Sequence, residues 1–268
     1  ILENLCAGVF EMCCRVRGTE QFYMDLVTNT DTACRLMDKF VELKVGYYRA
    51  AAERLGRYVQ LVREVDDIAG QQALLISPKM YRELIKPRHK ALFEAQRRYF
   101  PEPFYVFFHS DGAIYDVIPD FIELGVDVLN PVQLSVRGMD ARRLKGEFGR
   151  DLAFWGGGAD TQNILPTASP QQVKQDVAER IRRLAPGGGF VFSHIHNIQP
   201  ETLRNLIQFS YQLFWVVRHI VSLISRLKMV KISINMPKGI LKSPISSPFQ
   251  LEILHQVLEC EGDSDEGG

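Results

Sequence analysis

The segment VFFHSDG, residues 106–112, ends an apolar run on a histidine and an aspartate two positions apart, His109 and Asp111. On an extended chain, positions i and i+2 point to the same side, so the imidazole and the carboxylate would face the same space. Taken alone, the pair is explained most simply as a hydrogen-bonded cap that orients the following loop. The same two groups can also hold a divalent metal or move a proton.

Polar residues follow four other apolar runs in the same way. The five runs are continuous in apolar residues, and amphipathic helical segments separate them, which is typical of a parallel sheet covered by helices. An open sheet and a closed barrel both fit this pattern. Because barrel active sites collect side chains from several strand ends, we interpret these polar residues as one site. They are Asp66, Asp67, His109, Asp111, Asn130, Gln133, Asp160, Gln162, His194, His196, Asn197 and Gln199, with the glycines 156–158.

The composition is that of an ordinary globular protein. The 268 residues suffice for one large domain, or for one domain with appendages, and 46% of them are hydrophobic and 24% charged. Lys and Arg together number 32, as do Asp and Glu, so the zero formal net charge argues against nucleic acid or a membrane as the partner. The five cysteines form no Cys-x-x-Cys pair, which favours a reduced, cytoplasmic protein.

The two ends of the chain depart from the strand–helix pattern. The chain begins at Ile1 without a signal peptide and inside an amphipathic pattern, so we expect an N-terminal truncation. Residues 206–225 are the most apolar stretch, but Arg218 and His219 near its centre favour a packing helix over a membrane span. Residues 226–268 mix Lys, Pro and Ser and end in an acidic, Gly-rich sequence, which predicts an atypical, largely disordered tail.

Several separate blocks of residues 1–205 resemble one family. The blocks are VREVDDIAGQQALLISPKMYRELIKP, FFHSDG, GVDVLNPVQ, WGGGADTQNILP and PGGGFVFSHIHNIQP, in this order and spacing. Together they resemble the uroporphyrinogen decarboxylase superfamily, nearer its corrinoid-dependent methyltransferase branch than the decarboxylases of heme synthesis. The opening GVFEMCCRVRGTEQFYMDL is similar to the same branch.

The resemblance implies a fold and a metal site. The fold is an α/β (β/α)8 TIM barrel that is incomplete here, with about five C-terminal βα units and without the family's first strands and their arginine motif. In the methyltransferase branch, a His-x-Cys pair and a later Cys hold zinc, which activates a thiol to accept a methyl group from a corrinoid protein. Here the pair is matched by His109 and Asp111, and the last ligand position falls on His196.

Replacing both cysteines changes the character of the implied site. Two imidazoles and one carboxylate are harder ligands than thiolates and suit zinc, iron(II), manganese or cobalt, with zinc the first candidate. Three protein ligands leave positions open for water or substrate, as a catalytic metal requires. A histidine-rich strand end can also act as a general acid or base without any metal.

Further residues at the strand ends are candidates with two interpretations each. Asp66 and Asp67 could act in catalysis or bind metal, or could equally cap a helix. His194 could tune the metal or handle protons, or could donate to the backbone. Gly157 could let the backbone approach a cofactor, and Gln162 and Gln199 could bind it through their amides, although each amide taken singly more simply ties neighbouring loops together.

The sequence therefore leads to three hypotheses. The first is metal-dependent methyl transfer to a small-molecule substrate, with a corrinoid protein as partner. The second is decarboxylation of a porphyrinogen, which needs no cofactor, although most of the basic residues expected for its acidic substrate are missing. The third is a non-catalytic truncated barrel that acts as a subunit, since exposed sheet edges are normally covered or paired, for example in a homodimer.

Overall fold

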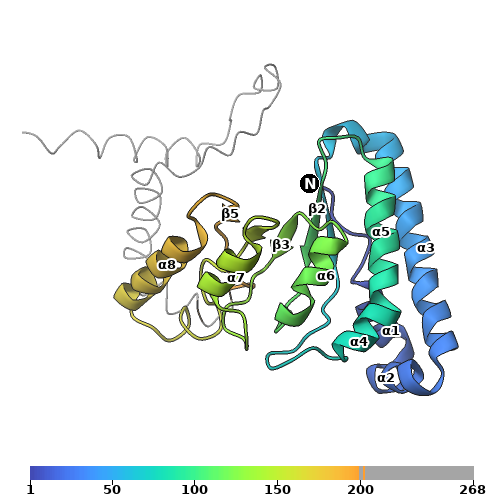
Figure 1. The fold of residues 1–268 in the computed structure, drawn as a ribbon, viewed down its shortest axis with the longest axis horizontal. Coiled ribbons are helices and arrows are strands. Elements are labelled where there is room, and N and C mark those ends of the chain that lie inside the picture. The colour runs from blue at the N-terminus through green and yellow to red at the C-terminus, as the bar shows by residue number, and fades with distance from the viewer. Residues whose placement is uncertain (199–201, 203–268) are drawn as a thin grey trace, which may run out of the picture. The chain divides into compact units, whose positions relative to one another are not determined.

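The computed structural model describes residues 1–198 and residue 202, and Figure 1 shows their arrangement. The packing helix expected at 206–225, the tail expected at 226–268, and Gln199 all lie outside the described residues. The chain opens with three helices and a single 3-10 turn. These are α1 (Val9–Arg17), α2 (Thr19–Thr28), α3 (Thr30–Leu55) and η1 (Gly56–Tyr58).

The described residues form a five-stranded sheet in which all neighbouring strands are parallel. The order in space is the order in the chain, β1-β2-β3-β4-β5. The strands are β1 (Leu61–Val65), β2 (Tyr105–His109), β3 (Val128–Asn130), β4 (Ala153–Trp155) and β5 (Phe190–Val191). The predicted parallel sheet is confirmed. A consecutive order with right-handed connections places the connecting helices on one face of the sheet, as in a TIM barrel.

Helices and short turns connect the strands. Between β1 and β2 lie α4 (Pro78–Met80), the π-helix η2 (Tyr81–Ile85) and α5 (Lys86–Tyr99). The 3-10 turn η3 (Tyr115–Val117) and α6 (Ile118–Glu123) precede β3, α7 (Ala141–Phe148) precedes β4, and α8 (Pro170–Leu184) precedes β5. Pro87 lies in the first turn of α5, a position that tolerates its missing N–H, and the π-helix η2 ends just before it.

The two faces of the sheet differ in burial. Phe108 of β2 contacts Phe93 of α5 and Phe121 of α6, so its side of the sheet faces the helices. The strand residues on this face are fully buried: Val62, Glu64, Val106, Phe108, Leu129 and Phe154. Residues one position away in the strands point to the opposite face and are less buried, and Tyr105 is 50% exposed. His109 therefore belongs to the face that the helices do not cover.

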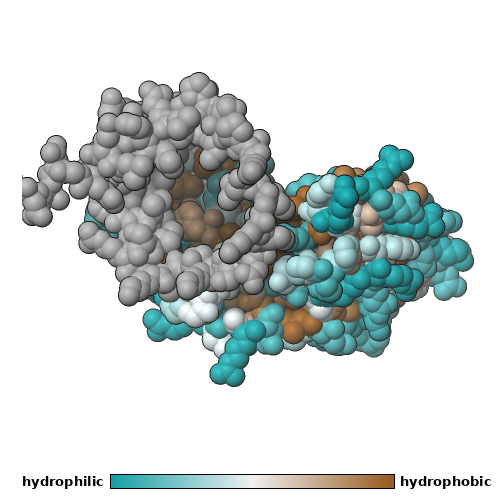
Figure 2. All heavy atoms as spheres, turned by 90° about the horizontal axis from the view of Figure 1, so that it is seen from above, coloured by the Kyte–Doolittle hydropathy of each residue, from teal (hydrophilic) through white to brown (hydrophobic). Residues whose placement is uncertain are grey.

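A buried ion pair fastens α3 to the first strand. Lys44 Nζ lies 2.6 Å from Glu64 Oε1, and neither side chain is more than 1% exposed. The Tyr48 hydroxyl donates to the second oxygen of the same carboxylate, and the Val65 N–H donates to the first. Helix α3 also runs beside α5, as Figure 1 shows. In Figure 2 the visible surface of the described residues is mainly hydrophilic, with smaller apolar areas between the polar side chains.

Candidate metal centre

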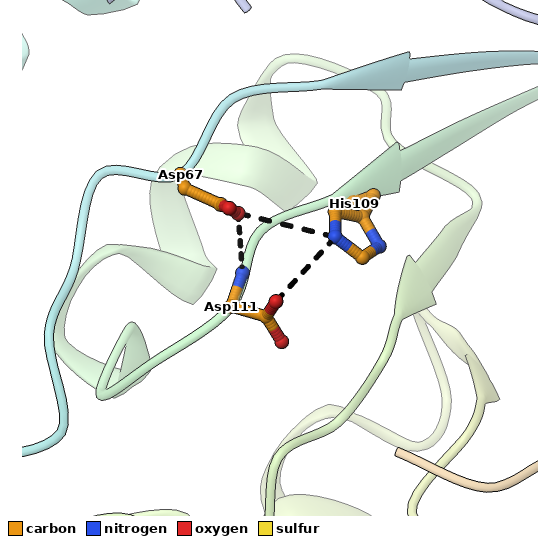
Figure 3. A group of neighbouring side chains, drawn as sticks. All are labelled: Asp67, His109 and Asp111. Carbon is orange, nitrogen blue, oxygen red and sulfur yellow. Dashed lines mark hydrogen bonds and ion pairs between the residues drawn. The ribbon is translucent and has the colours of Figure 1, made fainter. Parts of the chain in front are cut away.

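Three ligand-type side chains meet where β1 and β2 end. Asp67, His109 and Asp111 each offer an atom, and these atoms all lie within 4.8 Å of one another (Figure 3). His109 Nε2 is 3.9 Å from Asp67 Oδ1 and 3.7 Å from Asp111 Oδ2. The sequence placed His109 and Asp111 together as ligands, and the structure adds Asp67, which the sequence proposed as a catalytic residue.

Backbone interactions hold the three residues in place. His109 is the last residue of β2, and its carbonyl accepts from the Asp66 N–H, so the parallel ladder continues one residue past β1. The Asp111 N–H then donates to Asp67 Oδ1 at 2.8 Å. Gly112 follows with φ of 94°, and a Cβ there would come within 2.6 Å of the Ala69 carbonyl oxygen, so only glycine fits this turn.

The spacing of the three side chains is close to that of ligands around one ion. Zinc–oxygen and zinc–nitrogen bonds are about 2.0–2.2 Å long, so two ligands at a tetrahedral angle lie roughly 3.3–3.6 Å apart. The two separations from His109 Nε2, 3.7 and 3.9 Å, are slightly longer, so small side-chain shifts would bring these atoms to bonding distance of one ion. In addition, Asp111 Oδ1, the carboxylate oxygen other than the Oδ2 that faces His109, is buried and accepts no hydrogen bond from the described residues. A buried carboxylate oxygen without a donor is a costly arrangement that a cation would relieve.

The surroundings of Asp111 raise the pKa of its carboxyl above the ordinary value of an aspartate. Burial raises the pKa of its carboxyl, the Asp67 charge raises it further, and His109 and His196 oppose the shift. Without a bound cation, burial and the neighbouring Asp67 thus disfavour the negative charge of the Asp111 carboxylate. The fit of the residues to a divalent metal rests on this charge, on the spacing and on the orphaned oxygen.

A raised pKa makes the stability of the metal-free protein depend on pH. The folded state holds the Asp111 proton more tightly than the unfolded chain, so this stabilisation is complete at acid pH and is lost as pH rises through the folded-state pKa. Asp111→Asn removes the ionisation. We expect the metal-free variant to be more stable than the wild-type protein at neutral pH, with a smaller difference at acid pH. Urea unfolding at both pH values measures this, and a variant less stable at neutral pH would contradict the charge argument.

His196 approaches the cluster from the last strand region. Its Nε2 lies 3.8 Å from Asp111 Oδ2, and its side chain is 50% exposed. It thus faces Asp111, where the sequence placed a third ligand, but it stands outside the group of three. His194 is exposed and joins Ala159 in a parallel bridge, and none of the described contacts brings its side chain to the cluster.

Asp66 has a different environment from its neighbour. Its carboxylate is fully buried and accepts from the Phe10 and Glu11 N–H groups at 2.9 and 3.0 Å, at the start of α1. His89 Nε2 lies 2.9 Å from the same carboxylate, and His89 Nδ1 lies 3.3 Å from the Tyr81 hydroxyl. The structure thus places Asp66 in the core as a helix cap, in contrast to the catalytic role considered from the sequence. The capped helix precedes the strand rather than following it.

The structural role of Asp66 can be tested by one substitution. Asp66→Asn replaces one acceptor oxygen by a donor that faces a helix N–H in either orientation, that of Glu11 or that of Phe10 together with His89, and it removes a charge that helix N-termini favour. We expect a loss of about 2–3 kcal/mol in the free energy of unfolding, the size of a hydrogen bond to a charged group. Zinc binding by the remaining cluster is expected to persist. A stable variant with no activity would instead indicate a catalytic Asp66.

Gly157 and Gln162, two of the three residues expected to bind a cofactor, join loops in the described structure. Gly157 has φ of 69°, and its carbonyl accepts from Arg180 at 3.2 Å. The Gln162 Oε1 accepts from Gln133 Nε2 and from the Ser135 hydroxyl, each at 3.1 Å. These contacts match the simpler interpretation of such amides, and the cofactor role of Gly157, Gln162 and Gln199 stays a prediction.

Two residues near the site had no signal in the sequence. Glu11 accepts from the Gly8 and Asp67 N–H groups and so links the start of α1 to the cluster. His89 supports Asp66 from a helix that shows only amphipathic spacing in the sequence. Their roles depend on distant parts of the chain, 56 and 23 residues away from the partner, and local patterns carry no information on such pairs.

The parallel sheet of the described residues and its helices fit an α/β fold of the TIM-barrel type, and comparison with known proteins identifies the family. Residues 5–210 match the family described as uroporphyrinogen decarboxylase (URO-D), so the chain belongs to this family. Among solved structures, a methyltransferase from Methanosarcina mazei is similar, with a TM-score of 0.56 and 15% sequence identity. None of the curated proteins matches the chain.

The family match confirms the resemblance to the uroporphyrinogen decarboxylase superfamily. The structural match covers 78% of this chain and 57% of the methyltransferase, so the chain spans less than two thirds of that protein. At 15% identity the likeness shows the fold. In the part of the chain that the structure describes, no helix is both long and apolar enough to cross a membrane.

Proposed function

We propose that this protein is a metal-dependent methyltransferase of the uroporphyrinogen decarboxylase superfamily. Asp67, His109 and Asp111 would hold a divalent metal, zinc first among the candidates, and His196 would complete or flank the site. The observation that carries this proposal is the convergence of the three side chains at the ends of β1 and β2, with a buried carboxylate oxygen that lacks a donor.

The chemistry of the ligands defines what the site could do. A bound divalent metal would supply positive charge that lowers the pKa of a thiol or water beside it. The two carboxylates balance the charge of a divalent ion, while His109 adds a neutral donor. Because the described cluster contains no thiolate, the site is harder than a His/Cys/Cys site, and oxygen and nitrogen donors also suit iron(II), manganese and cobalt.

The proposed methyl donor is a corrinoid carried by a partner protein, and the acceptor is a small molecule. Asp67, His109 and Asp111 would hold the metal, and its positive charge would bind the acceptor's sulfur and favour the thiolate. The corrinoid would supply the methyl group, its cobalt would keep both electrons of the broken bond, and the thiol proton would pass to solvent.

The test is a methyl-transfer assay with the full chain. Zinc-loaded protein is mixed with methylcobalamin and a low-molecular-weight thiol, and the absorbance change of the corrinoid is followed with time under anaerobic conditions. The proposal predicts demethylation that a chelator stops and that added zinc restores. Equal rates with and without metal would overturn it.

Uroporphyrinogen decarboxylation is the second candidate, and the family match supports it. Purified protein that converts uroporphyrinogen without bound metal would establish this activity in place of methyl transfer. If neither reaction occurs, a non-catalytic role as a subunit becomes the better account. The size of the protein in solution, measured by light scattering, would then show whether the chain associates with itself.

A further inference from the structure

Asn130 contacts the candidate metal centre from the neighbouring strand. It is the last residue of β3 and pairs with His109 in the parallel register. Its Oδ1 is hydrogen-bonded to His109 Nδ1, the ring nitrogen that faces away from the two carboxylates. Its Nδ2 donates to the Trp155 carbonyl of β4 at 2.7 Å. One side chain thus joins the ends of three adjacent strands.

These two contacts fix the direction of the hydrogen bond to His109. A backbone carbonyl can only accept, so the Asn130 amide nitrogen must face Trp155 and its oxygen must face His109. An amide oxygen can only accept in turn, so His109 Nδ1 must carry the proton and donate it. In the neutral ring, Nε2 is then unprotonated, and its lone pair points toward Asp67 and Asp111.

We propose that Asn130 is a positioning residue that holds His109 in the form with its proton on Nδ1, and so prepares Nε2 to bind metal. In water, neutral imidazole favours the proton on Nε2, where it would block that atom as a ligand. Metal-binding histidines commonly donate their second ring N–H to a protein oxygen, which sets the orientation of the ring. The proposal rests on the proposed metal site, but the proton position can be measured without metal.

The side chain at position 130 must accept from His109 Nδ1 and donate to the Trp155 carbonyl, and an amide does both. A leucine at position 130 would have a similar size but no acceptor for His109 and no donor for Trp155. An aspartate would keep an acceptor for His109 and lose the donor to Trp155. The two substitutions therefore separate the effect on the histidine from the effect on the link between strands.

The experiment is long-range proton–nitrogen NMR of the metal-free full chain labelled with nitrogen-15 in its six histidines, at a pH where they are neutral. A His109→Gln sample assigns the His109 signals. The wild-type protein is expected to show Nδ1 protonated, Asn130→Asp to keep this pattern, and Asn130→Leu to shift the proton toward Nε2. Gln172→Leu, which removes an exposed side-chain amide that caps α8 and does not contact the cluster, serves as the control and is expected to resemble the wild type.

Zinc affinity, measured by competition with a chromophoric chelator, completes the test. We expect Asn130→Leu to weaken zinc binding about 10–100-fold, the usual effect of losing such a partner, and Asn130→Asp to weaken it much less. A wild-type signal with the proton on Nε2 would overturn the proposal even if a variant does not fold. So would unchanged zinc affinity in Asn130→Leu. A wild-type protein that binds no zinc would overturn the metal site itself, and the NMR signals would still report the Asn130 contact separately.

Discussion

Alanine in place of His109 is expected to weaken zinc binding more than about 100-fold, because losing a partner outside the ligand shell already costs about 10–100-fold. His109 supplies the nitrogen donor of the described cluster and lies between the two carboxylates. Its loss also leaves Asp67 and Asp111 to repel each other across the site. Metal-dependent methyl transfer is expected to disappear with the metal. Chelator competition and the corrinoid assay measure the two effects.

The stability of the His109→Ala variant serves as its control. His109 lies on the sheet face that the helices leave uncovered, outside the main core. We therefore expect a folded variant with a circular dichroism spectrum like that of the wild-type protein. His196→Ala is expected to weaken zinc binding less than His109→Ala does, because His196 is half exposed and lies beside the group of three. Wild-type zinc affinity in folded His109→Ala would place the metal elsewhere.

Lys44→Met is expected to cost about 3–5 kcal/mol in the free energy of unfolding, the usual penalty for leaving one member of a buried ion pair alone. The Glu64 carboxylate would stay in the core, with Tyr48 and the Val65 N–H as its remaining donors. Methionine has nearly the shape of the lysine stem, so little of the loss would come from packing. Urea unfolding followed by circular dichroism gives the number.

The double variant Lys44→Met with Glu64→Gln tests the cause of that loss. Glutamine removes the charge and can still accept from the Tyr48 hydroxyl. Replacing a buried pair by neutral groups is often close to neutral in stability, so the double variant is expected to regain most of the loss. If it is as unstable as Lys44→Met alone, the unpaired charge is not the cause.

The sheet could be predicted from the sequence because four of its five strands, all except β1, are short, mainly apolar runs. Parallel strands are buried on both faces, and helices must separate them in the chain, so the run of strand and helix patterns defines the fold class. His109 and Asp111 could be predicted as neighbours for an equally local reason. They stand two positions apart at a strand end, and the alternation of side chains continues through both.

The sequence of β1 does not show which of the two residues that follow it, Asp66 or Asp67, enters the site. Glu64 and Asp66 point to the helices, while Asp67 points to the face of His109. In β1 the charged residues Arg63 and Glu64 lie on opposite faces, so the sequence does not mark which face is buried, and Asp66 and Asp67 could not be told apart. The structure resolves them, one as a cap for α1 and the other as a ligand-type group.

Contacts between residues far apart in the chain could not be predicted from the sequence, for a different reason. Lys44 on a long helix shows only the polar spacing of a solvated face, yet it is fully buried against Glu64. Asn130 could be noted as a polar strand end, but its contact with His109 requires the register of β2 and β3. Such contacts depend on how elements pack, and that information is spread over the whole chain.

Elemental analysis of the purified full chain tests the central claim most directly. The protein is equilibrated with zinc, freed of excess by gel filtration, and analysed beside His109→Ala treated in the same way. The account predicts about one metal ion per wild-type chain, as a catalytic site with three protein ligands and an open position requires, and much less in the variant. A wild-type protein that is folded by circular dichroism and retains no metal would contradict it.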